Sequence, residues 1–399
     1  MSSVGVVLSG GGARGAYEAG VLAGIFEVLG LDARSAGPAP FDVFCGTSVG
    51  AINAAWLAAH CDRANAEIDG LLRNWLDLDV DKHLRVNPGG IVDLIKGLSI
   101  LLGRPSSSDA IPRSLLRIDA LEALVRDAMP WERLQGNVRS GNVRALIVAA
   151  LHIATGRTVL FADLAPGVSY AGSRDMRRVH KNARISADHV LASAAIPLIF
   201  PSRKIDGTHY CDGGLRFNTP IAPAIRAGAD KLVVIPLLRE RGEPSLAQQA
   251  VADYPNPIFL IGKLLNALLL DPVLYDLQIL ERFNALFGAL EGALTPEELS
   301  QVHDLLHQTR GMPYRRIETL VFRPTQDIGA MARDRAEELG NAKLTARVIS
   351  RASKLGHVWE ADLLSFVLFD GVFAERLIEL GRSDVVRRAG EVRRFFGRS

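Results

Sequence analysis

Cysteine is scarce in this sequence, and its net charge is close to zero. The 399 residues include three cysteines, Cys45, Cys61 and Cys211, at spacings that form no CxxC pair. This argues against both a disulfide framework and a structural zinc site, so we expect a reducing compartment. A formal net charge of +2 is too weak a field for nucleic acid to be the main partner, and no zinc-finger, RNA-binding or helix-turn-helix motif is present.

Long hydrophobic runs are absent as well. The first apolar run, Val4 to Leu8, has no basic region before it and is far too short for the core of a signal peptide. The most apolar stretch, Ile258 to Leu270, contains Lys263 and Asn266, so nothing approaches an uninterrupted membrane span. We therefore expect a cytoplasmic protein without signal peptide or transmembrane helix, and leave open a peripheral contact with a membrane.

The sequence does contain many apolar residues, and glycine turns separate its regular segments. Hydrophobic residues make up 48% and charged residues 23%, which is globular composition. Expected strands cover 4–8, 41–45, 143–154, 157–162, 204–210, 231–238 and 318–322, and expected helices include 16–29, 49–59, 119–129 and 186–195. Alternation of this kind predicts a mostly parallel sheet covered by helices on both faces.

The chain length allows either one large α/β domain with insertions or two domains, and we favour the first. The pattern is helical from residue 257 to about residue 309, and again, with many charges, from residue 327 onward. We therefore expect an α/β domain over residues 1–325 with a helical insertion at about 256–310, followed by a helical C-terminal extension over 326–399.

Two glycine-rich turns follow two of the expected strands. Gly10-Gly11-Gly12-Ala13-Arg14-Gly15 opens a helix, where backbone N–H groups can hold developing negative charge. Gly46-Thr47-Ser48-Val49-Gly50 is a G-x-S-x-G elbow, in which small flanking residues let a strained strand-to-helix turn push the Ser48 hydroxyl into the open. The first turn lacks the spacing of the phosphate-binding glycine motifs, so we interpret it as an oxyanion hole.

A serine nucleophile needs a base within hydrogen-bond reach. The nine histidines form no triad pattern, and the one nearest to another motif is His209, three residues before Asp212. Asp212 is the better candidate, because Asp212-Gly213-Gly214 follows a strand and lies at the sheet edge where α/β folds bind ligands. A carboxylate partly desolvated in an apolar cleft is more basic than in water and can accept the hydroxyl proton.

Four segments occur in the order seen in patatin-like phospholipases, and the chain resembles that family. They are Ser9 to Gly15, Gly46 to Gly50, Ala192-Ser193-Ala194-Ala195-Ile196-Pro197 and Asp212-Gly213-Gly214. The resemblance covers roughly residues 4 to 238. It implies a three-layer α/β/α patatin-like fold with a mostly parallel central sheet, and a lipid acyl hydrolase that needs no cofactor and no metal for the catalytic step.

The resemblance also implies a role for each site residue. Ser48 is the nucleophile, Asp212 is the base of a Ser–Asp dyad without histidine, and Arg14 helps to fix the oxyanion loop. The glycines around them are Gly10, Gly11 and Gly12 of the oxyanion hole, Gly46 and Gly50 of the elbow, and Gly213 and Gly214 of the aspartate turn.

We therefore expect a serine acyl-ester hydrolase that removes fatty acyl chains from phospholipids, lysophospholipids or related lipids. A transacylase with the same dyad and a catalytically silent membrane-binding or scaffold protein are the alternatives. Residues 257–290 fit either a lid over an acyl pocket or helices that complete the core. The segment Arg382 to Ser399 has six arginines and either lies on an anionic bilayer or docks on the protein. The sequence does not indicate an oligomeric state.

Overall fold

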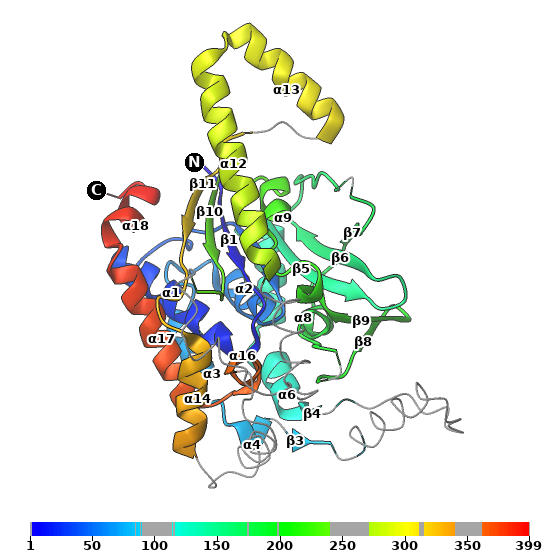
Figure 1. The fold of residues 1–399 in the computed structure, drawn as a ribbon, viewed down its shortest axis with the longest axis vertical. Coiled ribbons are helices and arrows are strands. Elements are labelled where there is room, and N and C mark those ends of the chain that lie inside the picture. The colour runs from blue at the N-terminus through cyan, green and yellow to red at the C-terminus, as the bar shows by residue number, and fades with distance from the viewer. Residues whose placement is uncertain are drawn as a thin grey trace, which may run out of the picture.

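The fold is built around one twisted sheet with helices on both sides, as a computed structural model shows (Figure 1). The structure describes residues 2–83, 85–87, 89, 114, 116–173, 175–197, 199–239, 271–310, 315–339 and 361–398. The strands of the sheet are β1 (Val4–Leu8), β2 (Val43–Thr47), β5 (Ala145–His152), β6 (Arg157–Leu164), β7 (Arg178–Asn182), β8 (Arg203–Ile205), β9 (Thr208–Asp212), β10 (Lys231–Ile235) and β11 (Glu318–Val321). A separate two-stranded sheet pairs β3 (Arg85–Val86) with β4 (Leu116–Arg117).

Most neighbouring strands run in the same direction. The strand order is β11-β10-β1-β2-β5-β6-β7, and the first five of these are parallel to one another. Strand β6 is antiparallel to β5, and β7 is parallel to β6. Strand β9 pairs antiparallel with β5 and with β8. The mostly parallel sheet that the sequence predicts is thus confirmed.

Helices cover both faces of the sheet. They are α1 (Gly15–Val28), α2 (Val49–His60), α3 (Ile68–Leu76), α4 (Val80–His83), α6 (Asp119–Ala128), α7 (Trp131–Ser140), α8 (Ala187–Ser193), α9 (Ile221–Arg226), α12 (Asp271–Ala293), α13 (Pro296–Arg310), α14 (Ile328–Leu339), α16 (Ala361–Val367), α17 (Gly371–Val386) and α18 (Ala389–Phe395), with single 3-10 turns at η1 (Gly12–Arg14) and η2 (Gly213–Leu215).

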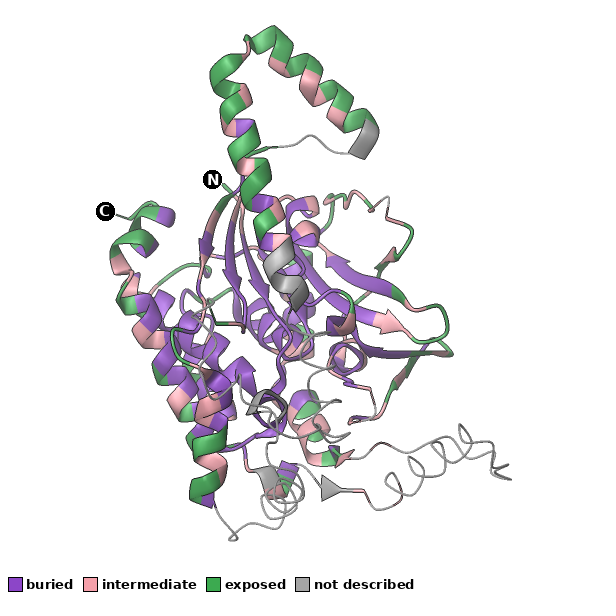
Figure 2. Cartoon of the chain, viewed as in Figure 1, coloured by how far each residue is buried: buried purple, intermediate pink, exposed green. Residues whose placement is uncertain are grey.

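Side chains of the central strands alternate between two cores, as the two-residue repeat of a strand requires. In β5, Leu146 and Val148 join the core formed with α1, α2 and α17, whereas Ala145 and Ile147 join the core formed with α9 and the start of α12. Figure 2 shows the central strands β1, β2 and β10 buried between these layers over almost their whole length. The three-layer α/β/α fold is therefore confirmed.

The C-terminal helix α17 packs directly on α1. A Cβ atom added at Gly20 would lie 2.2 Å from the carbonyl oxygen of Ile378, and one added at Gly381 would lie 2.5 Å from that of Tyr17. The hydroxyl of Tyr17 donates a hydrogen bond to Asp384 Oδ2 at 2.9 Å. Glycine on both helices thus allows their backbones to touch, and the C-terminal segment takes the docked arrangement rather than a free one.

Charges in this segment also bind within the molecule. Arg388 pairs with Glu391 at 2.7 Å, Arg387 pairs with Asp384, and Arg398 donates to the carbonyl oxygen of Leu29 at 2.6 Å. Within the described parts of the chain, no helix is both long and apolar enough to cross a bilayer.

The predicted insertion at 256–310 falls only partly on described residues, because 256–270 lie outside them. The rest forms α12 and α13, which extend away from the body of the molecule in Figure 1. Leu277 and Leu280 near the start of α12 are buried in the core beside α9, so this end of the helix completes that layer. Of the predicted C-terminal extension, residues 340–360 lie outside the described ranges. The domain division at 325/326 stays a prediction.

Substituting Gly20 by alanine tests the contact between α1 and α17. The added methyl group collides with a backbone carbonyl that cannot rotate away, so we expect the free energy of unfolding to fall by about 1–3 kcal/mol. Gly136 in α7 is the control, since nothing lies within 4 Å of its Cβ position. Gly136→Ala should instead stabilise the protein by about 0.5–1 kcal/mol. Urea unfolding of both variants measures the difference, and equal effects would contradict the close packing.

Candidate active site

The strand-to-helix elbow at Ser48 has the strained backbone that its motif predicts. Strand β2 ends at Thr47, α2 begins at Val49, and Ser48 between them has φ 55° and ψ −128°. A Cβ atom at Gly46 would lie 2.3 Å from the carbonyl oxygen of Gly50, so only glycine fits this turn. Ser48 is 3% exposed. Its hydroxyl is therefore covered by neighbouring groups rather than open to solvent, which differs from the sequence expectation.

Ser193, at the end of α8, is hydrogen-bonded to the elbow. The N–H of Ser48 donates to Ser193 Oγ at 2.8 Å, and that hydroxyl donates to the carbonyl oxygen of Ala149 at 2.6 Å. A completely buried hydroxyl thus ties the strained residue to β5. The sequence contained this serine only as part of a recognised motif and gave no role for it.

Strand pairing brings Asp212 to the same place. Strand β6 pairs with β5 from Ala145 to His152, which occupies one edge of β5 throughout. Strands β2 and β9 must therefore share its other edge, where Thr47 pairs with Ala149 and Asp212 with Ala150. The residue before Ser48 and the candidate base consequently pair with consecutive residues of one strand, although 165 positions of sequence separate them.

The carboxyl of Asp212 is completely buried. Its Oδ1 accepts a hydrogen bond from the N–H of Gly214 at 2.7 Å, while Oδ2 accepts none within the described residues. Burial raises the pKa of this carboxyl to about 7, against smaller lowering effects of the Ser48 hydroxyl and the Gly214 N–H. The group is thus a carboxyl that takes up or releases a proton near neutral pH, next to a serine hydroxyl.

His209 lies outside this arrangement. Its side chain is exposed, and its Nδ1 lies 3.4 Å from the hydroxyl of Ser202.

The backbone N–H groups of the glycine loop at η1 differ in whether they donate a hydrogen bond within the protein. The N–H of Gly10 donates to Asn218 Oδ1 at 2.8 Å, and Asn218 Nδ2 donates back to the carbonyl oxygen of Gly10 at 3.1 Å. In the part of the chain that the structure describes, the N–H groups of Gly11 and Gly12 donate no hydrogen bond. These two N–H groups are therefore the ones available to an oxyanion.

Helix α16, near the C-terminus, packs against this loop. Arg14, 3% exposed, donates from Nε to the hydroxyl of Ser365 at 2.6 Å and stacks over the ring of Phe366 with 4.7 Å to its centre. Gly12 has φ 57°, and a Cβ atom there would lie 2.1 Å from the carbonyl oxygen of Phe366. The loop can follow this path only because its residue has no side chain.

A second buried acid, Glu18, supports the loop from the other side. It accepts hydrogen bonds from the N–H of Ser9 at 2.8 Å and from Asn53 Nδ2 at 2.9 Å, and Asn53 Oδ1 accepts from Trp75 Nε1 at 3.2 Å. Burial raises the pKa of Glu18 well above its usual value. Sequence reasoning missed this residue, although an acid in the first turn of a helix that is otherwise apolar as far as Glu27 is a signal that would have singled it out.

Among the described residues, no group of three or more histidine, cysteine, aspartate or glutamate side chains is arranged so that it could hold a metal ion. The local chemistry is thus a serine hydroxyl beside a buried carboxyl, with free backbone N–H groups on the neighbouring loop. Acyl hydrolases use this combination on strand-to-helix elbows.

A sequence model of the patatin-like phospholipase family matches residues 6–225, which is more than half of the chain. The chain therefore belongs to this family. A curated relative from Pseudomonas aeruginosa (strain BWHPSA011 / Pa011), named cGAMP-activated phospholipase, is 30% identical over 219 residues. The match covers 54% of this chain and 53% of the relative, so the chain spans about half the length of that protein.

Two solved structures are similar at lower identity. VipD from Legionella pneumophila is 13% identical, with 94% of this chain and 91% of that chain covered and a TM-score of 0.29. The ExoU–SpcU complex from Pseudomonas aeruginosa is 17% identical, with 91% and 65% covered and a TM-score of 0.31.

Replacing Asp212 by asparagine tests the cost of burying this carboxyl. Because the folded-state pKa is raised from 3.8 to about 7, the group's contribution to stability is complete below about pH 4 and is lost as the pH rises to about 7. Above about pH 7 we expect Asp212→Asn to be more stable than the wild type by up to about 4 kcal/mol, and below about pH 4 to have no such advantage. Urea unfolding at both pH values measures this.

The exposed Asp69 in α3 provides the matched control. Asp69→Asn should show no gain that grows with pH. If Asp212→Asn and the wild type differed by the same amount at both pH values, burial would not be what perturbs this carboxyl.

Proposed function

We propose that this chain is a serine lipid acyl hydrolase that removes fatty acyl chains from phospholipids, lysophospholipids or related lipids through Ser48 and Asp212. The observation that carries the proposal is the shared edge of β5, which aligns the ends of β2 and β9. The name of the curated relative supports phospholipid as a substrate class. We transfer nothing else from that protein.

In the proposed reaction, Ser48 Oγ attacks the ester carbonyl carbon while Asp212 takes the hydroxyl proton. The carbonyl oxygen becomes an oxyanion that accepts hydrogen bonds from the N–H groups of Gly11 and Gly12. As the ester bond breaks, Asp212 returns the proton to the leaving alcohol. Water then attacks the acyl-enzyme, Asp212 accepts a proton from it, and the proton passes to Ser48 as the fatty acid leaves.

Burial of Asp212 suits this role. A pKa of about 7 makes the carboxylate a stronger base than an exposed aspartate, while a large part of it stays ionised at neutral pH. The remaining predicted residues fit supporting roles: Gly46 and Gly50 permit the elbow, Gly213 permits the aspartate turn, and Gly10 anchors the loop to Asn218. Gly214 donates its N–H to Asp212. Arg14 positions the loop through Ser365.

We also propose that the helical C-terminal extension, residues 326–399, acts as a brace for the catalytic domain. Its described part contacts the oxyanion loop through Ser365 and Phe366, and contacts α1 through Asp384. The buried side chains of Val385, Val392 and Phe395 support a brace of this kind at the arginine-rich end of the chain, while four of the six arginines there stay exposed.

Ser48→Ala tests the nucleophile. Removing the hydroxyl leaves no group to form the acyl-enzyme, so we expect release of fatty acid from a panel of phospholipids and lysophospholipids to fall at least about 1000-fold. The melting temperature should stay within about 2 °C, because alanine keeps the backbone of the elbow.

Ser35, a half-buried residue between α1 and β2, provides the control, and Ser35→Ala should keep full activity. Retained turnover in Ser48→Ala would refute the assignment. In the wild type, a competing alcohol that collects the acyl group in place of water would identify a transacylase. Failure of a fluorophosphonate probe to label the folded wild type would favour a silent scaffold.

The pH dependence of the rate tests the base. Because Asp212 accepts a proton only when ionised, kcat/KM should rise with pH, reach half of its maximum near pH 7 and level off above it. Initial rates on a substrate without ionisable groups, from about pH 5 to about pH 9, measure this. His209→Gln should leave the profile unchanged. Loss of the rise in that variant would instead make His209 the base.

A further inference from the structure

Glu18, a buried acid that the proposed reaction does not use, lies between the oxyanion loop and helix α2. It is on the first turn of α1 and is completely buried. Its Oε1 accepts a hydrogen bond from the N–H of Ser9, the residue before Gly10, at 2.8 Å. Its Oε2 accepts one from Nδ2 of Asn53, on the second turn of α2, at 2.9 Å. One carboxyl group is thus bonded both to the start of the loop and to the helix that follows the nucleophile.

The loop and α2 are in direct contact beside the nucleophile. A Cβ atom added at Gly10 would lie 3.0 Å from the Cβ of Ser48. One added at Gly50 would lie 2.8 Å from the carbonyl oxygen of Ser9. A displacement of the loop relative to α2 therefore moves the free N–H groups of the loop relative to the Ser48 hydroxyl. A misplacement of about 1 Å in an active site can lower the rate about 100-fold.

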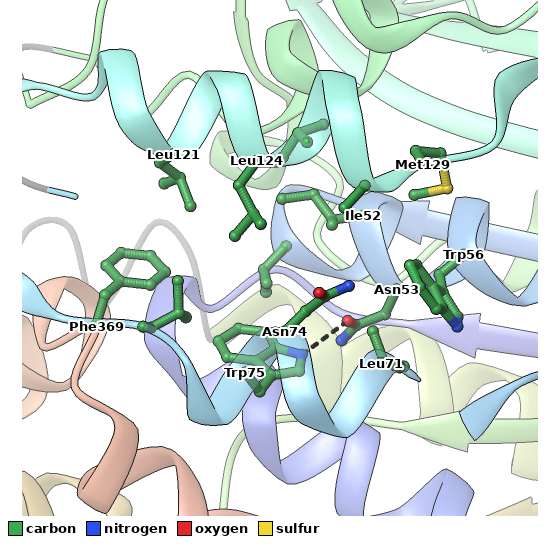
Figure 3. A pocket seen from close by; sticks show the side chains of 14 residues that line it. Ile52, Asn53, Trp56, Leu71, Asn74, Trp75, Leu121, Leu124, Met129 and Phe369 are labelled. Carbon is green, nitrogen blue, oxygen red and sulfur yellow. Dashed lines mark hydrogen bonds between the residues drawn. The ribbon is translucent and has the colours of Figure 1, made fainter. Parts of the chain in front are cut away.

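The other contacts of Asn53 fix which side of its amide faces Glu18. Its Oδ1 accepts a hydrogen bond from Nε1 of Trp75 at 3.2 Å, drawn as a dashed line in Figure 3, beside the cavity between α2, α3 and α6. Its Nδ2 also donates to the carbonyl oxygen of Gly15 at 3.1 Å. An indole N–H only donates and a carbonyl oxygen only accepts, so the amide cannot turn over without losing both bonds. Asn53 therefore presents a donor to Glu18.

Both groups that face the Glu18 carboxyl are thus N–H donors. A carboxylate offers an acceptor on each oxygen, whereas the side-chain amide of glutamine offers one acceptor and one donor. A glutamine at this position would leave one N–H directed at another. Burial raises the pKa of Glu18 well above its usual value, and the two hydrogen bonds counteract this only in part. An acid that is costly to bury therefore occupies a position where two acceptors are needed.

We propose that Glu18 is a positioning residue, which holds the oxyanion loop against α2 by accepting a hydrogen bond from each. The proposal rests on the proposed function, because the loop is placed for the oxyanion that forms when Ser48 attacks an ester. Glu18 itself contacts neither the substrate nor the reacting atoms. Without its two acceptors, the N–H groups of Gly11 and Gly12 no longer meet the oxyanion, while the ester still binds in its ground state.

Glu18→Gln tests this role at about pH 9, which favours the ionised carboxyl in the wild type. On p-nitrophenyl butyrate we expect kcat to fall about 100-fold and KM to stay within about threefold, because only the transition state uses the displaced N–H groups. An alkylboronic acid, which forms a tetrahedral adduct on Ser48, should lose affinity by a similar factor. Glu27→Gln is the matched control, since Glu27 is exposed on the same helix, and both constants should be unchanged. An unchanged kcat in folded Glu18→Gln would overturn the proposal.

Exchanging the two groups gives a second test, which also decides the question if Glu18→Gln fails to fold. Asn53→Asp alone directs a carboxylate at Glu18 and should lower kcat as well. In the combined variant a donor and an acceptor face each other again, Trp75 and Ser9 keep their acceptors, and only the bond to Gly15 is lost. Its kcat should exceed the product of the two single effects at least about tenfold. A kcat equal to that product would contradict the pairing.

Amide hydrogen exchange separates this proposal from the proposed function, because it needs no turnover. Peptides that cover residues 8–16 should exchange faster in Glu18→Gln than in the wild type or in Glu27→Gln, since one of the bonds that hold the loop is lost. Faster exchange supports the positioning role even if Ser48→Ala retains turnover and another nucleophile is found. Equal exchange in all three proteins would refute the positioning role and leave the assignment of Ser48 standing.

Discussion

The candidate site depends on one edge of one strand. Because β6 occupies the whole of the other edge of β5, β2 and β9 must follow each other along the remaining one. That constraint places the end of β2, just before Ser48, beside the end of β9, which carries Asp212. A shift of β9 by one residue would turn Asp212 to the opposite face of the sheet. The Ser193 hydroxyl, bonded to Ala149 on the same edge, reinforces this register.

Two buried acids make the site unfavourable for folding. Burial raises the pKa of Glu18 and of Asp212, which means that the ionised form of each is disfavoured in the folded protein. The strained backbone of Ser48 adds to this cost. The apolar layers on both faces of the sheet must compensate for it. Arrangements of this kind are typical of sites in which reactivity, rather than stability, determines the residue.

Local patterns made much of this structure predictable. The strand at Val4–Leu8, the elbow at Ser48 and the turn at Asp212 each depend on a few consecutive residues, and the alternation of strands with helices indicates the parallel sheet. What sequence reasoning could not provide are contacts between distant segments. The N–H of Gly10 is bonded to Asn218, 208 positions away, and no local pattern indicates that this donor is taken. The contacts of Ser193 with Ser48 and Ala149, 145 and 44 positions away, were missed for the same reason.

The contact between Arg14 and Ser365 joins groups 351 positions apart in the chain. Segments near the N-terminus leave the ribosome first and fold early during synthesis. The loop at Gly12 can then form its helix start, but the carbonyl of Phe366 that packs against it does not yet exist. A growing chain that already contains both Ser48 and Asp212 thus lacks the backbone against which the Gly12 loop packs. The candidate site is therefore complete only after the C-terminal helices have been translated.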